Sequence, residues 1–204
     1  MKSLNDLKPA DWLFKYEDII LFAKTQHKGQ KRKGSDDDYF THLTEVSYLL
    51  GLITNDRDLI AGGVLHDVVE DVEGIENSDV AELAGESVAK LVEEATNVSK
   101  LKEGNRAFRR EADALRLLTI SNRGKTLKLA DCIHNLTSDQ LDDDFTKLYY
   151  SEKRNLLLSL YGGDKTLFKA LVIVITHYYT TGTIYSYQKI IESIRTEGIL
   201  NWNK

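Results

Sequence analysis

The stretch Leu65–Asp71 combines a histidine with three carboxylates, those of Asp67, Glu70 and Asp71. On a helix, residues three and four apart share a face, so Glu70 would lie near His66 and Asp67, and Asp71 near Asp67. The acids follow the end of the apolar pattern, near the negative end of a helix dipole, where negative charge is disfavoured. A bound cation would compensate for that cost. A solvated acidic helix end beside a buried histidine is the alternative interpretation.

His42 and Asp131 extend this group to two imidazoles and two carboxylates on three separate expected helices. Two nitrogens and two oxygens suit Mn²⁺, Fe²⁺, Zn²⁺ or, less well, Mg²⁺. Four protein ligands on a six-coordinate ion leave positions for water and a substrate oxygen, which a hydrolytic metal requires. Each of these residues also has a purely structural interpretation, because a lone histidine is often a packed core residue and Lys-Leu-Ala-Asp is a common helical tetrapeptide.

The composition is that of a soluble globular protein, with 42% hydrophobic and 29% charged residues among 204. A net charge of -5 gives no support for general nucleic-acid or membrane-surface binding. The single cysteine excludes an internal disulfide framework and suits a reducing cytosol. Neither a signal peptide nor a membrane-spanning segment is evident, since the longest apolar segment is Ala170–Thr176. A cytoplasmic location is therefore expected.

Apolar residues recur at a spacing of three to four along the chain, and the single proline, Pro9, precedes all the predicted helices. The prediction is an all-α, single helical bundle over 1–204, with a motif core at about 20–160 and a C-terminal helical extension at about 161–204. Asn55 or Asp56 and Ser78 are the strongest helix-start signals. Glycines 29, 34, 74, 104, 124, 162 and 163 are expected in loops or at helix ends. The predicted helices are 10–27, 40–53, 56–71, 79–84, 86–98, 104–119, 125–138, 145–161, 164–180 and 184–197.

Five motifs follow one another in the chain: HxGQxRKG at 27–34, Tyr-x-x-His at 39–42, HDxxED at 66–71, GExVAxLV at 85–92 and KLADxxxN at 128–135. This order resembles the HD-domain metal-dependent phosphohydrolase superfamily. It is most similar to the hydrolase domain of RelA/SpoT-type proteins and to the small stand-alone alarmone hydrolases. The resemblance covers about residues 20–160 and implies an all-α HD-domain bundle.

The resemblance also implies roles for individual residues. One divalent ion, usually Mn²⁺ in this branch, would be held by His42, His66, Asp67 and Asp131. Glu70 and Asp71 match the pair that orients the attacking water and manages its proton. The substrate contacts would be Arg32, Lys33, Lys128, Asn135 and Ser138.

Several side chains keep a structural interpretation beside the functional one. Arg32 and Lys33 belong to a charge run that suits a solvated basic loop. Asn135 would serve equally as a helix cap or a surface amide. His27 is interpreted as structural, as is His177, and Cys132 is interpreted as a small apolar filler.

The implied activity is removal of the 3′-pyrophosphate from (p)ppGpp, a small nucleotide. Two departures from the family pattern bear on the choice of substrate. The first is the run of three acids at 36–38, which precedes Tyr39 where relatives usually have Gly-x-Pro. These acids would repel a pyrophosphate unless they point away from it. The second is Cys132, which stands where many relatives have a basic residue. A generic HD phosphatase or phosphodiesterase for another nucleotide, and an inactive nucleotide-binding relative, are the alternatives. The apolar run 171–175 suits core packing or a subunit contact, which leaves a homo-oligomer open.

Overall fold

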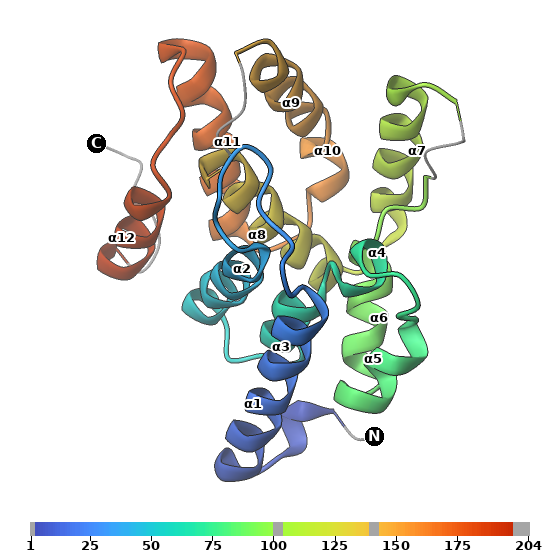
Figure 1. Ribbon diagram of the computed structural model, residues 1–204. Helices are drawn as coiled ribbons and strands as arrows, with labels where there is room; N and C mark the ends of the chain where they lie inside the picture. Colours follow the sequence, from blue (N-terminus) through green and yellow to red (C-terminus); the bar gives the residue numbers. More distant parts are fainter. Residues whose placement is uncertain (1–2, 100–103, 139–142, 198–204) are drawn as a thin grey trace. The chain divides into compact units, whose positions relative to one another are not determined.

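The computed structural model of the chain describes residues 3–99, 104–138 and 143–197, and these fold almost entirely into helices (Figure 1). Over these residues the only extended pairing is an isolated bridge between Lys31 and Asp38. None of the described helices is long and apolar enough to cross a membrane. The elements are η1 Leu4–Asp6, α1 Pro9–Gln26, α2 Tyr39–Ile53, α3 Arg57–Leu65, α4 Val68–Asp71, α5 Asn77–Ala84, α6 Glu86–Ala95, α7 Arg106–Thr119, α8 Asn122–Ser138, α9 Asp143–Asn155, α10 Leu157–Leu160, α11 Lys165–Thr181 and α12 Tyr187–Glu197.

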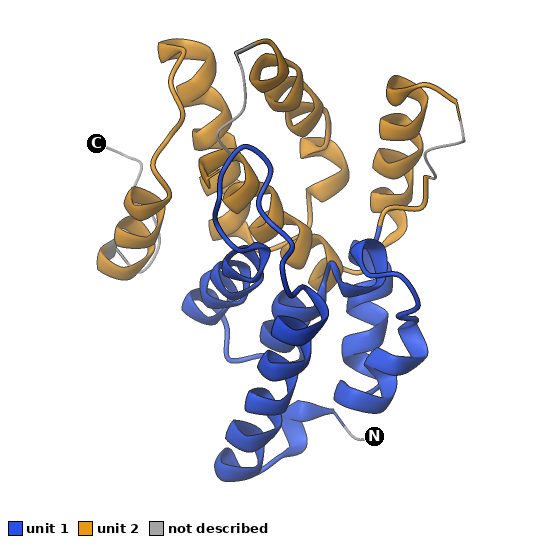
Figure 2. Ribbon diagram, viewed as in Figure 1, with its two compact units in different colours: residues 1–96 blue, residues 97–204 orange. Residues whose placement is uncertain are grey.

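The chain divides into two compact units, residues 1–96 and residues 97–204 (Figure 2). The first unit contains η1 and α1 to α6, and the second contains α7 to α12. The single domain over 1–204 stays a prediction. The last residues of the predicted C-terminal extension, 198–204, lie outside the described part of the chain.

The first unit is built on the close packing of α3 against α2. Gly63 makes this approach possible, because a Cβ atom at this position would lie 2.8 Å from Ser47 Cα and 2.9 Å from Leu50 Cδ1. The Ser47 hydroxyl then donates to the carbonyl of Ile60 over 2.8 Å, across the same interface. The buried apolar residues around it are Leu4, Ile19, Ala23, Leu43, Ala61, Val64, Leu65, Val68, Val80, Ala84, Val88, Ala89 and Val92.

The prediction of one helix over 56–71 is wrong in one respect, because the helix is interrupted at His66 and Asp67. α3 ends at Leu65 with His66 as its C-cap, and α4 begins at Val68 with Asp67 as its N-cap. Asp56 caps α3 as expected, accepting a hydrogen bond from the amide of Leu59. The acids 70 and 71 thus lie in the first turn of a short helix and not at the end of a long one. The unfavourable helix dipole inferred from the sequence is therefore absent from this stretch.

The second unit is organised on α8, most of whose side chains are buried. α11, α10 and α12 pack against it. Tyr150 of α9 is 1% exposed and donates to the carbonyl of Leu136 in α8 over 2.7 Å. The free thiol of Cys132 is fully buried, as expected for an apolar filler, and burial raises its pKa. It therefore stays protonated at neutral pH.

Three further local predictions are wrong. The helix predicted over 145–161 is two helices, α9 and α10, separated at Leu156. Glu76, and not Ser78, caps α5, through a capping box in which the backbone amide of Glu76 donates to Asp79 over 2.8 Å. Gly124 lies buried within α8, although the other expected loop glycines fall between helices.

Candidate metal centre and active site

His42, His66 and Asp67 bring three potential ligand atoms to one point in the first unit. The Nε2 atoms of the two histidines are 3.2 Å apart, and Asp67 Oδ2 lies 3.0 Å from His66 Nε2 and 3.5 Å from His42 Nε2. Both histidines are buried and Asp67 is 9% exposed. α2 supplies His42, while the junction between α3 and α4 supplies the other two. The close α2–α3 packing at Gly63 therefore sets the distance between the two imidazoles.

These separations fit a common divalent cation. Two ligand atoms bound to one ion at about 2.1 Å and at right angles lie roughly 3.0 Å apart. The Nδ1 atom of His66 lies 2.9 Å from the carbonyl oxygen of Gly63, so Nδ1 carries the proton and Nε2 presents its lone pair to the group. Without a cation, two buried imidazole nitrogens and a carboxylate oxygen would share this space at a cost in desolvation.

Tyr39 and Asp71 extend the group on its exposed side. The Tyr39 hydroxyl donates to Asp67 Oδ2 over 2.6 Å, which holds this carboxylate in place. Gln30 Nε2 donates to Asp71 Oδ2 over 3.0 Å, and the backbone amide of Asp71 donates to the carbonyl of Asp67 over 2.8 Å. Partial desolvation of the Asp71 carboxylate raises its pKa, and the negative charge of Asp67 raises it further. A carboxylate with a raised pKa is a better proton acceptor near neutral pH.

The basic loop between α1 and α2 places its arginine over an aromatic ring and engages two of its acids with side chains of the loop. The guanidinium of Arg32 lies over the ring of Tyr39, 5.4 Å from its centroid, whereas the exposed Asp38 pairs with Lys31 at 2.7 Å. Asp37 accepts a hydrogen bond from the hydroxyl of Ser35 over 3.0 Å. Two of the three acids that departed from the family pattern are thus engaged within the loop. Lys33 is exposed, and its predicted contact with substrate stays a prediction.

Asp131, the fourth predicted ligand, lies in α8 of the second unit and is 3% exposed. Its Oδ2 pairs with Lys128 Nζ at 2.9 Å, and its Oδ1 accepts a hydrogen bond from the amide of Asn135. The predicted substrate contacts Lys128 and Asn135 therefore both contact Asp131. Ser138 donates to the carbonyl of His134 over 2.6 Å. The roles of Asp131 as ligand and of these three as substrate contacts stay predictions.

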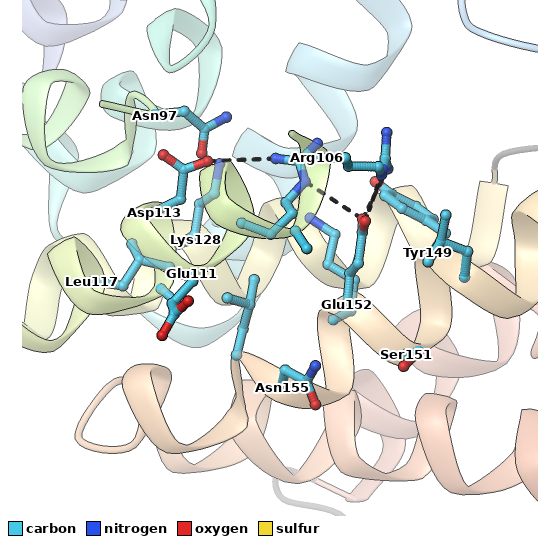
Figure 3. Close-up of a pocket in the computed structure, with 16 residues that line it drawn as sticks. Asn97, Arg106, Glu111, Asp113, Leu117, Lys128, Tyr149, Ser151, Glu152 and Asn155 are labelled. Atoms are coloured by element: carbon cyan, nitrogen blue, oxygen red, sulfur yellow. Dashed lines mark hydrogen bonds and ion pairs between the residues drawn. The ribbon is translucent and has the colours of Figure 1, made fainter. Parts of the chain in front are cut away.

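A cavity of about 600 Å³ lies in the second unit, between α7, α8 and the chain from Leu148 to Leu156 (Figure 3). Arg106 closes one side of it with a bidentate pair to Glu152, at 2.5 Å and 2.8 Å, and its guanidinium also lies over the ring of Phe145. Arg110 approaches Glu152 at 3.4 Å. The volume of this cavity is typical of a site that binds a small molecule. Its charged lining residues are Arg106, Arg110, Glu111, Asp113, Lys128, Glu152 and Lys153.

Of these charged lining residues, only Lys128 was a predicted site residue. Arg106 and Arg110 are one helical turn apart, which places both on the same face of α7. That spacing was visible in the sequence, but alternating charges on an amphipathic helix are the usual pattern of a solvated surface. Nothing in the spacing showed that Glu152, 46 residues beyond Arg106, would meet it.

The described residues form an all-helical fold that brings together a His-His-Asp cluster, the arrangement of a metal-binding helical domain. The sequence matches the HD domain family over residues 20–156, and the chain belongs to that family. Within it, the chain is related to the RelA/SpoT (p)ppGpp hydrolase domains.

The similar proteins make this relationship specific. The chain is 32% identical over 143 residues to the bifunctional (p)ppGpp synthase/hydrolase SpoT of Escherichia coli K12, covering 66% of this chain and 20% of that protein. It is 33% identical over 144 residues to a probable guanosine-3′,5′-bis(diphosphate) 3′-pyrophosphohydrolase of Synechocystis, covering 68% of this chain and 19% of that protein. The chain thus spans a fifth or less of the length of these relatives.

A solved structure extends the likeness to the fold. It is described as a metazoan ortholog of SpoT that hydrolyses ppGpp, and it superposes with a TM-score of 0.71 at 26% identity. The match covers 82% of this chain and 96% of that one. The RelA/SpoT resemblance predicted from the motifs and the all-helical HD fold are both confirmed.

Proposed function

We propose that this protein is a metal-dependent nucleotide phosphohydrolase that removes the 3′-pyrophosphate of guanosine 3′,5′-bis(diphosphate). The observation that carries the proposal is the convergence of His42, His66 and Asp67 at separations that suit one divalent ion. The relatives named for ppGpp hydrolysis support the choice of substrate.

His42, His66 and Asp67 would hold the ion, with Asp131 as the fourth ligand proposed from the sequence. Mn²⁺ is the proposed ion, and Fe²⁺, Zn²⁺ and Mg²⁺ are also compatible with two nitrogens and two oxygens. A bound divalent ion supplies Lewis-acid polarisation of the phosphoryl group and lowers the pKa of a coordinated water. The protonation of His66 on Nδ1 suits it to this role, because Nε2 then faces the other two groups.

Asp71 and Glu70 would orient the attacking water and take up its proton. Asp71 is suited to accept that proton because partial desolvation and Asp67 raise its pKa. Attack at phosphorus would release pyrophosphate, leaving the 3′-hydroxyl of the nucleotide. Arg32, Lys33 and Lys128 would balance the phosphate charge, since preorganised cations stabilise the charge that develops during phosphoryl transfer.

The test is to incubate the purified protein with Mn²⁺ and ppGpp and to look for GDP and pyrophosphate. A panel of other phosphorylated nucleotides is assayed in parallel, and the D67A variant serves as the control without a ligand carboxylate. Turnover of another nucleotide in the absence of ppGpp turnover would contradict the proposed substrate. Absence of bound metal and of all turnover would contradict the proposed enzyme.

A further inference from the structure

The turn His27–Gln30 connects α1 to the loop that precedes the site. The backbone amide of Gln30 donates to the carbonyl of His27 over 3.0 Å, and Gly29 has a φ of +82°. A four-residue turn with a positive φ at its third residue favours glycine there and brings the side chains of its first and last residues together. The amide of Tyr39 then donates to the carbonyl of Gln30 over 2.9 Å, which fixes Gln30 from the other side.

The side chains of this turn lead to the proposed base. His27 Nδ1 lies 2.7 Å from Gln30 Oε1, and Gln30 Nε2 donates to Asp71 Oδ2 over 3.0 Å. Because the Gln30 amide nitrogen faces a carboxylate, its oxygen must face His27, and His27 must then donate from Nδ1. One histidine proton therefore fixes the orientation of an amide that holds Asp71.

His27 is buried at a cost that packing alone does not explain. The side chain is 2% exposed, and among the described residues its Nε2 has no hydrogen-bond partner. Its ring stacks on Tyr39, with centroids 5.2 Å apart and planes inclined by 18°. A phenylalanine would fill the same space and stack in the same way, without a buried nitrogen that lacks a partner. The one contribution that phenylalanine cannot make is the Nδ1–H donor to Gln30.

We propose that His27 is a positioning residue for Asp71, acting through the side-chain amide of Gln30. This inference rests on the proposed function, because it assigns a role toward the proposed base. It differs from the interpretation of His27 as structural, and the experiments below distinguish the two. Tyr39 would hold the ligand Asp67 and also contribute a hydrogen bond to Asp71, while His27 would hold Asp71 through the separate hydrogen bond from Gln30.

Three variants separate this role from packing. H27F keeps the ring and removes the donor, H27N places an amide N–H where Nδ1 stands, and Q30M removes the amide from the chain of hydrogen bonds. We expect H27F to lower kcat by about tenfold or more, as groups that orient ligands and catalytic residues do, with KM and Mn²⁺ affinity unchanged. H27N should recover most of the lost kcat.

A double variant tests whether His27 acts through Gln30. If it does, H27F/Q30M should be no slower than Q30M alone, because the second change removes a contact that is already lost. The melting temperature of H27F should equal or exceed that of the parent protein, whereas a structural role would lower it together with activity. Parental kcat in H27F, additive losses in the double variant, or no recovery in H27N would each overturn the proposal. If H27F fails to fold, H27N and H27Q repeat the comparison, since only the shorter amide reaches the Nδ1 position.

A measurement independent of turnover separates this inference from the proposed function. Long-range ¹H–¹⁵N spectra of the imidazole groups, recorded with diamagnetic Mg²⁺, should show His27 protonated on Nδ1 at neutral pH. An Nε2-protonated His27 would overturn the role whatever the substrate. A parent protein that does not turn over ppGpp, yet shows this tautomer, would count against the proposed substrate and leave the His27–Gln30–Asp71 connection supported.

Discussion

Replacement of Gly63 by alanine tests the packing that brings His42 and His66 together. The added Cβ would lie 2.8 Å from Ser47 Cα, 2.9 Å from Leu50 Cδ1 and 3.0 Å from the Ser47 nitrogen. Two of these are backbone atoms, so α2 and α3 must separate. Overpacking of this kind costs about 1–3 kcal/mol, whereas replacing glycine by alanine inside a helix contributes about 1 kcal/mol of stability.

Gly51 provides a matched control on α2, because it is exposed and a Cβ added there would meet nothing within 4 Å. Both substitutions are glycine to alanine inside a helix, so the propensity contribution cancels when the two variants are compared. We expect G63A to be less stable than G51A by about 1–3 kcal/mol, the cost of overpacking alone. G51A itself should be slightly more stable than the parent protein.

Urea unfolding measures this difference, since a shift of the midpoint at constant slope reports a change in the free energy of unfolding. Titration of Mn²⁺ by calorimetry adds a second reading. Separation of α2 from α3 displaces His42 from His66, so G63A should bind Mn²⁺ more weakly while G51A binds it as the parent does. Equal stability of the two variants would refute the argument that Gly63 sets the spacing of the imidazoles.

Three further predictions concern the ligand set, a buried carboxylate and alkaline pH. D67A should lose bound Mn²⁺, measured by metal analysis, together with turnover; full turnover would place the site elsewhere. D58A should lower the free energy of unfolding by about 1–3 kcal/mol, because it removes the buried Asp58 carboxylate that accepts the amide of Leu4 at 2.7 Å, and unchanged urea unfolding would contradict this. Burial raises the pKa of Tyr150, so the folded state keeps a proton that the unfolded state releases above about pH 10. The parent protein should therefore lose stability as pH rises above this value, and Y150F should lose less. Melting temperatures that fall equally for the two proteins across the alkaline range would refute this prediction.

The sequence predicted the fold class and most helices because apolar spacing reports directly which residues face a core. It failed where a side-chain contact, and not periodicity, ends a helix. His66 continues the apolar pattern of α3, yet its Nδ1 meets the carbonyl of Gly63 and the chain turns before Val68. Glu76 was missed as a cap because serine is the stronger statistical signal, although the capping box with Asp79 is what forms.

The candidate site was predictable to the extent that motif order reports shared ancestry. The cluster of His42, His66 and Asp67 forms as predicted, although His42 and His66 are 24 residues apart in the sequence. The position of Asp131 beside Lys128 follows from helical spacing within α8, but its part in binding an ion does not. The link from His27 to Asp71 passes through Gln30, which lies 41 residues before Asp71 in the sequence. No local sequence pattern shows which carboxylate the side-chain amide of a loop residue will contact.

The contact between His66 and Gly63 has a consequence for how tightly an ion is held. The ring is anchored to a main-chain carbonyl in the last turn of α3, so its two torsions are fixed by the fold before any ion arrives. Side-chain freedom that is already lost during folding does not weaken ion capture, which is the advantage of a preorganised ligand. The same anchor restricts how far Nε2 can shift to accommodate cations of different radius. Discrimination among similar divalent ions would then arise from the rigidity of this helix end as much as from the chemistry of the ligand atoms.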